Sequence, residues 1–312
     1  MSLRLRVKSA TWEAPGVLSY ELRPLEGGDL PPFTAGAHID LTLPNGLVRS
    51  YSLVNPQSER DRYVIAVQMD RASRGGSKWL HENLRAGDIV TANGPRNNFA
   101  LDETAEKSIL LAGGIGITPI LSMIDRLSAL GRDWELVYCS RKRASTAFLE
   151  ALEMNPRVRF NFDEEPGGKI LDVAALVKAA PANAHLYCCV PLPMLEAFEQ
   201  ATKDLARNRV HVEYFAAKEP PAVEGGFKVV LAKSGRELTV PPGKTILEAL
   251  CDAGLEIPHS CTEGICGTCE TKVLEGVPDH RDRILTESER AANKTMFICC
   301  SGSRSAKLVL DL

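Results

Sequence analysis

The stretch Cys261-Thr-Glu-Gly-Ile-Cys266-Gly-Thr-Cys269 has the spacing Cys-x4-Cys-x2-Cys, and Cys299 follows after 29 further residues. This is the plant-type ligand pattern of a 2Fe–2S cluster, in which a tight loop supplies three thiolates and a distant segment the fourth. Gly264 and Gly267 let the backbone fold closely around the cluster and direct N–H groups at its sulfurs. Structural zinc sites favour short paired spacings, which fit this pattern poorly. The pattern predicts a protein that moves single electrons.

Composition narrows the class of protein further. The 312 residues, 44% hydrophobic and 25% charged, are typical of two or three globular domains. A net charge of −3 without a basic run gives no sign of nucleic-acid binding. No apolar stretch approaches the ~20 residues that span a membrane, and the N-terminus has no signal-peptide core. The remaining cysteines lie in apolar surroundings, as reduced thiols do, so we expect a cytoplasmic protein. They are Cys139, Cys188, Cys189, Cys251 and Cys300.

Three blocks of different rhythm follow one another along the chain. Residues 1–103 contain short alternating segments such as 39–43 and 63–69, separated by turn signals, which predict an antiparallel β-barrel. Residues 104–217 alternate apolar strands with helical patterns, which predicts an α/β domain with a parallel sheet.

A linker rich in Pro and Gly, residues 218–226, leads to the last block. Residues 227–312 start with an apparent hairpin around Ser234-Gly235. A helix over 245–253 and the cysteine loop follow. The chain then ends on a predicted strand at 308–312.

Two motifs of the first block suit a flavin. Arg49-Ser50-Tyr51-Ser52 lies on a predicted strand, where the Arg can pair with a phosphate and the Tyr can stack or hydrogen-bond. Some 25 residues later, Ser73-Arg74-Gly75-Gly76-Ser77 opens a helical segment, a favourable setting for a phosphate. Each motif alone also suits an ordinary strand or hairpin turn, but together and in this order they favour a flavin.

The second block has a glycine turn in the position of a nucleotide site. Gly113-Gly114-Ile-Gly116-Ile-Thr118-Pro119 follows a strand and opens a helix, although Pro119 replaces the third Gly of the Gly-x-Gly-x-x-Gly fingerprint. At the ends of neighbouring strands, Ser140 and Arg141 are candidates to contact the adenosine end, and Cys189 to face the nicotinamide. The basic run 141–143 leaves open whether NADH or NADPH is used. A buried strand cysteine and a solvated basic loop remain the ordinary alternatives.

This order of motifs resembles the reductase components of Rieske non-haem iron oxygenases, of the phthalate dioxygenase reductase and vanillate O-demethylase reductase type. The resemblance covers essentially the whole chain. It implies a flavin barrel, a nicotinamide domain and a C-terminal α+β, β-grasp-like ferredoxin domain. It further implies FMN on Arg49, Ser50, Tyr51, Ser52, the turn Arg74 to Ser77 and Phe215, with the pyridine nucleotide on Gly113 to Pro119. The cluster ligands would be Cys261, Cys266, Cys269 and Cys299.

The chain departs from the family pattern at two positions. Val190 in Cys189-Val190-Pro191 takes the place of a Gly, which narrows the approach to the nicotinamide. Cys300 takes the place of a small aliphatic residue, and Cys299 is the preferred ligand because Ile298-Cys299-Cys300-Ser301 matches the family's Ile-Cys-x-Ser pattern.

The function implied is NADH-dependent electron transfer through FMN and the cluster, one electron at a time, to a separate Rieske-type oxygenase. The sequence contains no Rieske ligand pairs and no 2-His-1-carboxylate signature, which places oxygen activation on another protein. We expect a monomer whose docking surface is bordered by Glu263 and the polar segment 279–283. Two alternatives remain: a stand-alone NAD(P)H:acceptor reductase for flavins or quinones, and a redox-sensing binding protein.

Overall fold

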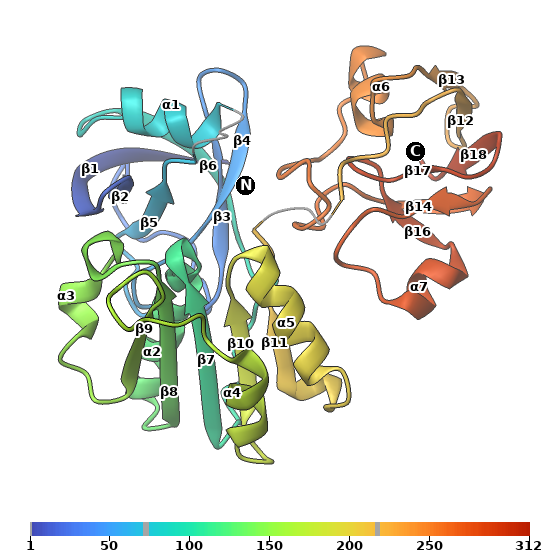
Figure 1. The fold of residues 1–312 in the computed structure, drawn as a ribbon. Helices are drawn as coiled ribbons and strands as arrows, with labels where there is room; N and C mark the ends of the chain where they lie inside the picture. Colours follow the sequence, from blue (N-terminus) through green and yellow to red (C-terminus); the bar gives the residue numbers. More distant parts are fainter. Residues whose placement is uncertain (1, 71–74, 216–218) are drawn as a thin grey trace. The chain divides into compact units, whose positions relative to one another are not determined.

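A computed structural model of the chain describes residues 2–70, 75–215 and 219–312. The chain forms two compact units, residues 1–213 and 214–312. Figure 1 shows the order of the elements: an antiparallel sheet and a parallel sheet in the first unit, and a mixed sheet in the second. Within the described residues, no helix is both long enough and apolar enough to cross a membrane.

The first sheet is antiparallel and curls into a barrel. Its six strands lie in the order β4-β3-β6-β1-β2-β5. An antiparallel bridge between Leu53 and Ile65 joins the two outer strands, which closes the sheet. Every second side chain along a strand points into the barrel, and inward-facing residues such as Leu5 and Tyr20 fill its interior. The elements are β1 (Ser2–Ala14), β2 (Val17–Pro24), β3 (His38–Thr42), β4 (Val48–Ser52), β5 (Tyr63–Gln68), α1 (Gly76–Asn83) and β6 (Ile89–Arg96).

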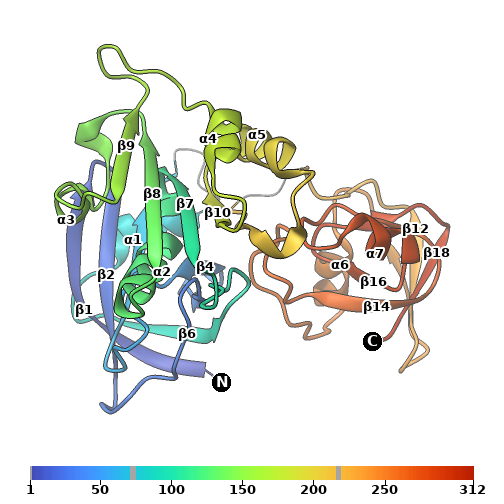
Figure 2. The same ribbon diagram turned by 90° about the horizontal axis from the view of Figure 1, so that it is seen from below.

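The second sheet is parallel, in the order β11-β10-β7-β8-β9. Figures 1 and 2 show α2 on one face of it and the neighbouring α4 and α5 on the other, as parallel sheets require. The strands are β7 (Lys107–Gly113), β8 (Asp133–Ser140), β9 (Val158–Phe162), β10 (His185–Cys189) and β11 (Val210–Val212). The helices are α2 (Ile117–Ala129), α3 (Leu149–Leu152), α4 (Val173–Ala179) and α5 (Leu192–Thr202).

Barrel and parallel sheet share one hydrophobic core, which fixes their relative position within the first unit. Ala35 and Phe99 from the barrel side pack with Met123 of α2 in this core. Gly36 lies at the contact, where a Cβ would come within 2.0 Å of the Phe99 carbonyl oxygen and 2.8 Å of Met123 Cε. Its N–H donates to Ser122 Oγ at 3.1 Å. A larger residue at position 36 would have to displace the Phe99 backbone, whereas the flexible end of Met123 could move aside.

The second unit has a mixed sheet in the order β13-β12-β18-β14-β16, with β12 and β18 parallel. Helix α6 starts at a capping box in which Thr245 and Glu248 satisfy each other's backbone N–H groups. Its elements are β12 (Phe227–Leu231), β13 (Glu237–Val240), α6 (Ile246–Asp252), β14 (Glu270–Glu275), β15 (Pro278–Asp279), α7 (Glu287–Ala292), β16 (Thr295–Phe297), β17 (Gly302–Ser303) and β18 (Lys307–Leu310). The predicted fold class, an antiparallel barrel, an α/β domain and an α+β domain, is confirmed.

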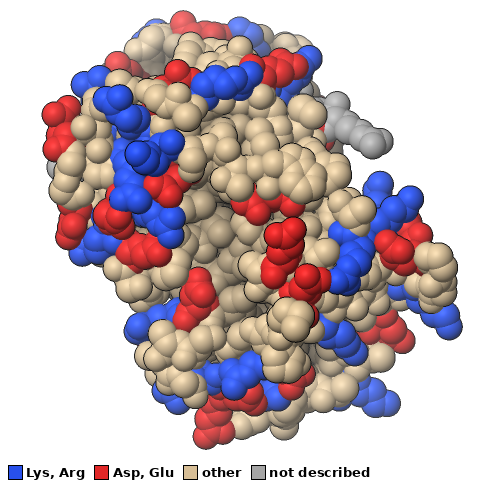
Figure 3. Space-filling view, turned by 90° about the vertical axis from the view of Figure 1, so that its left-hand side faces the viewer, with Lys and Arg blue, Asp and Glu red and all other residues tan. Residues whose placement is uncertain are grey.

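Charged side chains of both signs lie on the surface of the molecule (Figure 3). On the face shown in Figure 3, acidic and basic side chains are interspersed. Several surface charges are paired, such as Arg62 with Glu59 and Lys107 with Glu135.

Candidate functional site

The four predicted cluster ligands lie in two segments of the second unit. Cys261, Cys266 and Cys269 belong to the loop between α6 and β14, and Cys299 follows β16. All four are buried. The Cys261 thiol is in hydrogen-bond contact with Cys266 and Cys299, and the Cys269 thiol with Cys299. The fold therefore brings together residues that are up to 38 positions apart in the sequence.

The backbone of the cysteine loop is shaped to face sulfur atoms. Thr262, Gly264 and Gly267 have φ angles of 58°, 69° and 80°, a left-handed conformation that glycine adopts without strain. Turns of this kind direct successive N–H groups to one side. The N–H of Glu263 donates to Cys261 Sγ at 3.3 Å. The loop thus stabilises negative charge on a cysteine sulfur.

The thiol contacts also separate the pKa values of these cysteines. The Cys266 thiol lowers the pKa of Cys261, and the Cys299 thiol lowers that of Cys269. The same contacts raise the pKa of Cys266 and Cys299. This is the behaviour of thiols that share protons at close range. Binding of iron would replace these protons and hold all four residues as thiolates.

The donor set fits a two-iron centre. In the described part of the chain, no group of three or more His, Cys, Asp or Glu side chains is arranged around a single ion. The thiols of Cys261, Cys266, Cys269 and Cys299 meet in one chain of contacts, with Cys261 touching Cys266 and Cys299, and Cys299 touching Cys269. Four thiolates in one place are what a 2Fe–2S cluster needs. The neighbouring Cys300 contacts the Phe297 carbonyl oxygen and Ser301 Oγ.

In the barrel, Arg49 of β4 lies against the start of α1. A Cβ on Gly76 would come within 2.8 Å of Arg49 Cγ and 2.9 Å of its Nε. Gly75, with φ of 93°, turns the chain into the helix, and Ser77 Oγ accepts the Asp70 N–H at 3.2 Å. A guanidinium beside a helix N-terminus is a favourable phosphate site. The predicted Arg74 lies outside the described residues.

The other predicted flavin residues of β4 face two directions. Tyr51 packs at the edge of the barrel core, and burial raises its pKa. Ser50 Oγ donates to Asp40 Oδ1 at 2.7 Å, and Asp40 is ion-paired with Arg96. Ser52 is buried. Arg49 and Tyr51 share one face of the strand, as residues two positions apart must.

The predicted nucleotide turn packs directly on the end of β10. A Cβ on Gly116 would meet the Cys189 carbonyl oxygen at 2.1 Å and its Sγ at 3.1 Å, and one on Gly113 would meet Val190 Cβ at 3.1 Å. Gly114 has φ of 53°. These positions need glycine because the turn and the strand end touch.

Helix α2 begins at Ile117, with Gly116 as its N-cap. Thr118 does not cap it: its hydroxyl donates to the Ile115 carbonyl oxygen at 3.0 Å. Thr118 and Pro119 are buried in the first turn.

Glu213 is a candidate that sequence reasoning missed. It follows β11, and its N–H donates to the Cys188 carbonyl oxygen at 3.0 Å. Its Oε2 is buried without a hydrogen-bond partner among the described residues, and burial raises its pKa to about 8. The Glu213 carboxyl in turn adds to the raised pKa of the buried Cys189, whose main cause is burial. A buried carboxyl with one oxygen left unpartnered by the described residues, beside Cys189 at the carboxyl end of a parallel sheet, makes Glu213 a candidate for a ligand site.

The basic run after β8 is matched by carboxylates. Ser140 Oγ contacts the Lys142 carbonyl oxygen at 3.4 Å. Glu164, after β9, lies 3.6 Å from Arg141 and 3.9 Å from Lys142. Arg143 pairs with Glu153.

The predicted aromatic Phe215 belongs to the second unit and is 43% exposed.

Comparisons with known proteins agree with this geometry. Residues 229–302 match the 2Fe-2S iron-sulfur cluster binding domain family. The chain is 54% identical to the phenoxybenzoate dioxygenase subunit beta of Ectopseudomonas oleovorans, over 99% of this chain and 97% of that protein. It is 53% identical to the tetrachlorobenzoquinone reductase of Sphingobium chlorophenolicum, over 100% and 98%.

Among solved structures, phthalate dioxygenase reductase, described as modular for electron transfer from pyridine nucleotides to [2Fe-2S], matches with a TM-score of 0.79. It is 39% identical and is aligned over 100% of this chain and 98% of its own. Similarity of this extent covers the barrel, the parallel sheet and the cysteine loop together. The chain therefore belongs to the family of iron–sulfur flavoprotein reductases of oxygenase systems that includes phthalate dioxygenase reductase and vanillate O-demethylase oxidoreductase.

Proposed function

We propose that this chain transfers electrons from NADH through FMN and a 2Fe–2S cluster to a separate Rieske-type oxygenase. Residues 1–103 would bind FMN, 104–217 the nucleotide and 227–312 the cluster, with 218–226 as linker. The observation that carries the proposal is the meeting of the four cysteine thiols in a chain that also has the barrel and the glycine turn.

Each site contributes positioning and electrostatics rather than acid–base chemistry. Bound flavin supplies the conversion of a hydride into single electrons, and the cluster carries one electron at a time. Arg49 and the N-terminus of α1 would hold the FMN phosphate. Gly113 and Gly116 let the turn pack against the end of β10, and Gly114, where a Cβ would meet nothing within 4 Å, would leave room for the nucleotide. Cys189 and Glu213, which are neighbours at the end of β10, would lie beside the nicotinamide, where the Glu213 carboxyl could hydrogen-bond its amide.

The surroundings of the basic run favour NADH over NADPH. A 2′-phosphate would need free cations at the adenosine end of the site. Glu164 pairs with Arg141 and Lys142, and Glu153 pairs with Arg143. The carboxylate of Glu164 would also repel a phosphate directly, whereas it can accept a hydrogen bond from a 2′-hydroxyl.

A quinone reductase is the second candidate, because one relative at 53% identity has that name. A quinone can collect electrons at the flavin, so its reduction would not require the cysteine loop. An oxygenase accepts electrons singly at its own iron centre, so its reduction would pass through the cluster.

The full chain and its Cys299→Ser variant separate these candidates. Both would be reduced with NADH and mixed with a Rieske-type oxygenase or with tetrachlorobenzoquinone in a stopped-flow instrument. We expect the variant to lose oxygenase reduction while its flavin still bleaches with NADH. Equal oxygenase reduction by both proteins would contradict the proposed role of the cluster. Quinone reduction at the wild-type rate, with no transfer to any oxygenase, would favour the second candidate.

A further inference from the structure

The segment after β15 is tied to both parts of the cysteine site. The Arg283 N–H donates to the Gly264 carbonyl oxygen at 2.9 Å, inside the three-cysteine loop. The Arg281 N–H donates to Ser301 Oγ at 3.2 Å, two residues after Cys299. The residue between these two anchors, Asp282, is therefore held beside the site.

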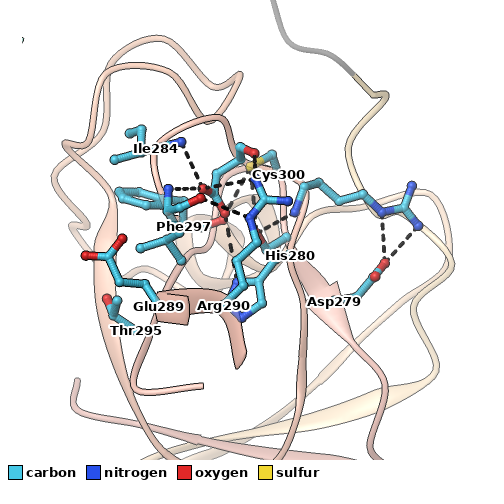
Figure 4. Close-up of polar contacts among 12 residues, drawn as sticks. Asp279, His280, Ile284, Glu289, Arg290, Thr295, Phe297 and Cys300 are labelled. Atoms are coloured by element: carbon cyan, nitrogen blue, oxygen red, sulfur yellow. Dashed lines mark hydrogen bonds and ion pairs between the residues drawn. The ribbon is translucent and has the colours of Figure 1, made fainter. Parts of the chain in front are cut away.

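Asp282 carries a carboxylate with no exposed side-chain surface. Its Oδ2 accepts the N–H groups of Ile284 and Leu285 at 3.0 and 2.8 Å. Its Oδ1 has no hydrogen-bond partner among the described residues, and His280 Nδ1 is 3.9 Å away. The Arg290 guanidinium lies 3.8 Å from Oδ2 and donates to the Asp282 carbonyl oxygen. Figure 4 shows His280, Arg290 and Cys300 gathered in this region.

A structural role alone does not explain the charge of Asp282. The two N–H groups at Oδ2 need an acceptor, which the amide oxygen of Asn would supply equally well. Burying an ionised carboxylate without a close, hydrogen-bonded cation is costly. The negative charge itself is therefore the feature that needs a function.

Gly264 brings this charge close to the ligand loop. A Cβ at position 264 would lie 2.9 Å from Asp282 Cα, 3.2 Å from Asp282 Cβ and 2.5 Å from Cys300 Sγ. With no side chain there, Asp282 packs against the backbone between Cys261 and Cys266. In such poorly solvated surroundings, a buried charge interacts more strongly with neighbouring charges than it would in water.

We propose that Asp282 sets the reduction potential of the cluster, its buried charge making reduction less favourable and the reduced cluster a stronger electron donor. This inference rests on the proposed function, because it assumes a 2Fe–2S cluster on the four cysteines. Reduction adds one negative charge, which a nearby anion opposes, and cluster potentials respond to local charge and solvent exposure. Arg290 acts in the opposite direction as a partial counter-charge.

The test is the midpoint potential of the cluster in the purified full chain, titrated anaerobically with a chemical reductant and followed by EPR. Asp282→Asn should raise the potential by about 59 mV, which is a tenfold shift toward the reduced cluster for one electron. The matched control is Asp279→Asn, three residues away, whose carboxylate is neutralised by Arg281 at 2.8 Å and Arg304 at 3.1 Å. In this control, the equilibrium constant for reduction of the cluster should change less than threefold. An unchanged potential in Asp282→Asn, or an equal shift in the control, would overturn the proposal.

A second variant keeps the test decisive if Asp282→Asn does not retain iron. Arg290→Gln removes the counter-charge and should lower the potential, whereas Arg290→Lys should restore it. A purely structural disturbance would not move the potential in opposite directions for opposite charges, so an unchanged or raised potential in Arg290→Gln also overturns the proposal. Because the reductant is chemical, the result does not depend on nucleotide or flavin. Wild-type protein without iron would instead refute the proposed function.

Discussion

The cysteines of the two units lie in opposite chemical environments. Cys188 and Cys189 occupy a central strand of the parallel sheet, where burial raises the pKa of both thiols well above the ordinary value. Cys261 lies in a loop where neighbouring thiols lower its pKa and a backbone N–H points at its sulfur. The difference shows that surroundings, not residue type, decide whether a buried cysteine serves packing or ligation.

The cause of the difference is the backbone. In β10 the N–H groups are used in the ladder with β7 and β11, so none remains for a sulfur. In the loop over 261–269, residues with positive φ leave N–H groups outside any sheet. A ligand cysteine thus needs irregular backbone, which explains why the site lies between α6 and β14 and not within either.

The largest expected effect comes from comparing the loss of one cluster-ligand thiol with the loss of one thiol from strand β10. Cys269→Ser should reduce iron and sulfide content to near zero, because the cluster needs four thiolates. Cys188→Ser should keep the iron and lower the free energy of unfolding by about 1–3 kcal/mol, since it buries a hydroxyl in an apolar strand. Metal and sulfide analysis measures the cluster content, and unfolding by denaturant measures the free energy of unfolding. Iron retained in Cys269→Ser would contradict the ligand assignment.

Adjacent cysteines give the second test. Cys299 contacts the thiols of Cys261, Cys269 and Cys300, whereas Cys300 beyond this contact reaches only the Phe297 carbonyl oxygen and Ser301 Oγ among the contacts that the described residues show. Cys299→Ser should therefore lose the visible absorption of the cluster, and Cys300→Ser should keep it. The reverse result would make Cys300 the fourth ligand.

The third test concerns Glu213, the buried carboxyl next to Cys189, and the pH dependence of protein stability. Its pKa is raised from 4.5 to about 8, so between these values the folded protein holds a proton that the unfolded chain releases. This group's contribution to stability is full below pH 4.5 and falls as pH rises to about 8. Relative to Glu213→Gln, the wild type should lose about 1.4 kcal/mol of unfolding free energy per pH unit across this window. Unfolding by denaturant from pH 5 to 9 measures the difference, and parallel curves for the two proteins would contradict a buried, neutral Glu213.

The smallest effect is expected at the exposed ion pairs of Glu164. Glu164→Gln should raise the ratio of kcat/KM for NADPH to that for NADH by about two- to fivefold, which is the range of surface pairs. Glu150→Gln, which alters an exposed carboxylate on α3, is the matched control and should leave the ratio unchanged. If Glu164→Gln had the same NADPH-to-NADH ratio of kcat/KM as the wild type, Glu164 would not contribute to selectivity for NADH.

The cluster loop and the fold class could be predicted from the sequence because both depend on the spacing of residues that are close together in the chain. The intervals between Cys261, Cys266 and Cys269 specify a loop around a cluster, and alternating strands with a glycine turn indicate the fold class. These signals lie within short windows. Burial of single polar residues has no such signal, because it depends on elements distant in the chain.

Glu213 and Asp282 illustrate that limit. Glu213 follows a short strand, and nothing in Glu213-Tyr214-Phe215 shows that its carboxyl lies beside Cys189. The polar run 279–283 suggests a surface segment, yet Asp282 is buried against Gly264. The exact start of helix α2 also has no such signal, since the 3₁₀ turn Gly114–Gly116 leads directly into the helix and makes Gly116 its N-cap.

The most direct test of the account is an anaerobic titration of the purified full chain with NADH, followed by its visible spectrum. The account predicts bleaching of both flavin and cluster, with roughly three electrons taken up per chain, two by the flavin and one by the cluster. Bleaching of the flavin alone would contradict either the ligand assignment or electron transfer between the two units. No bleaching with NADH or NADPH would refute the reductase function.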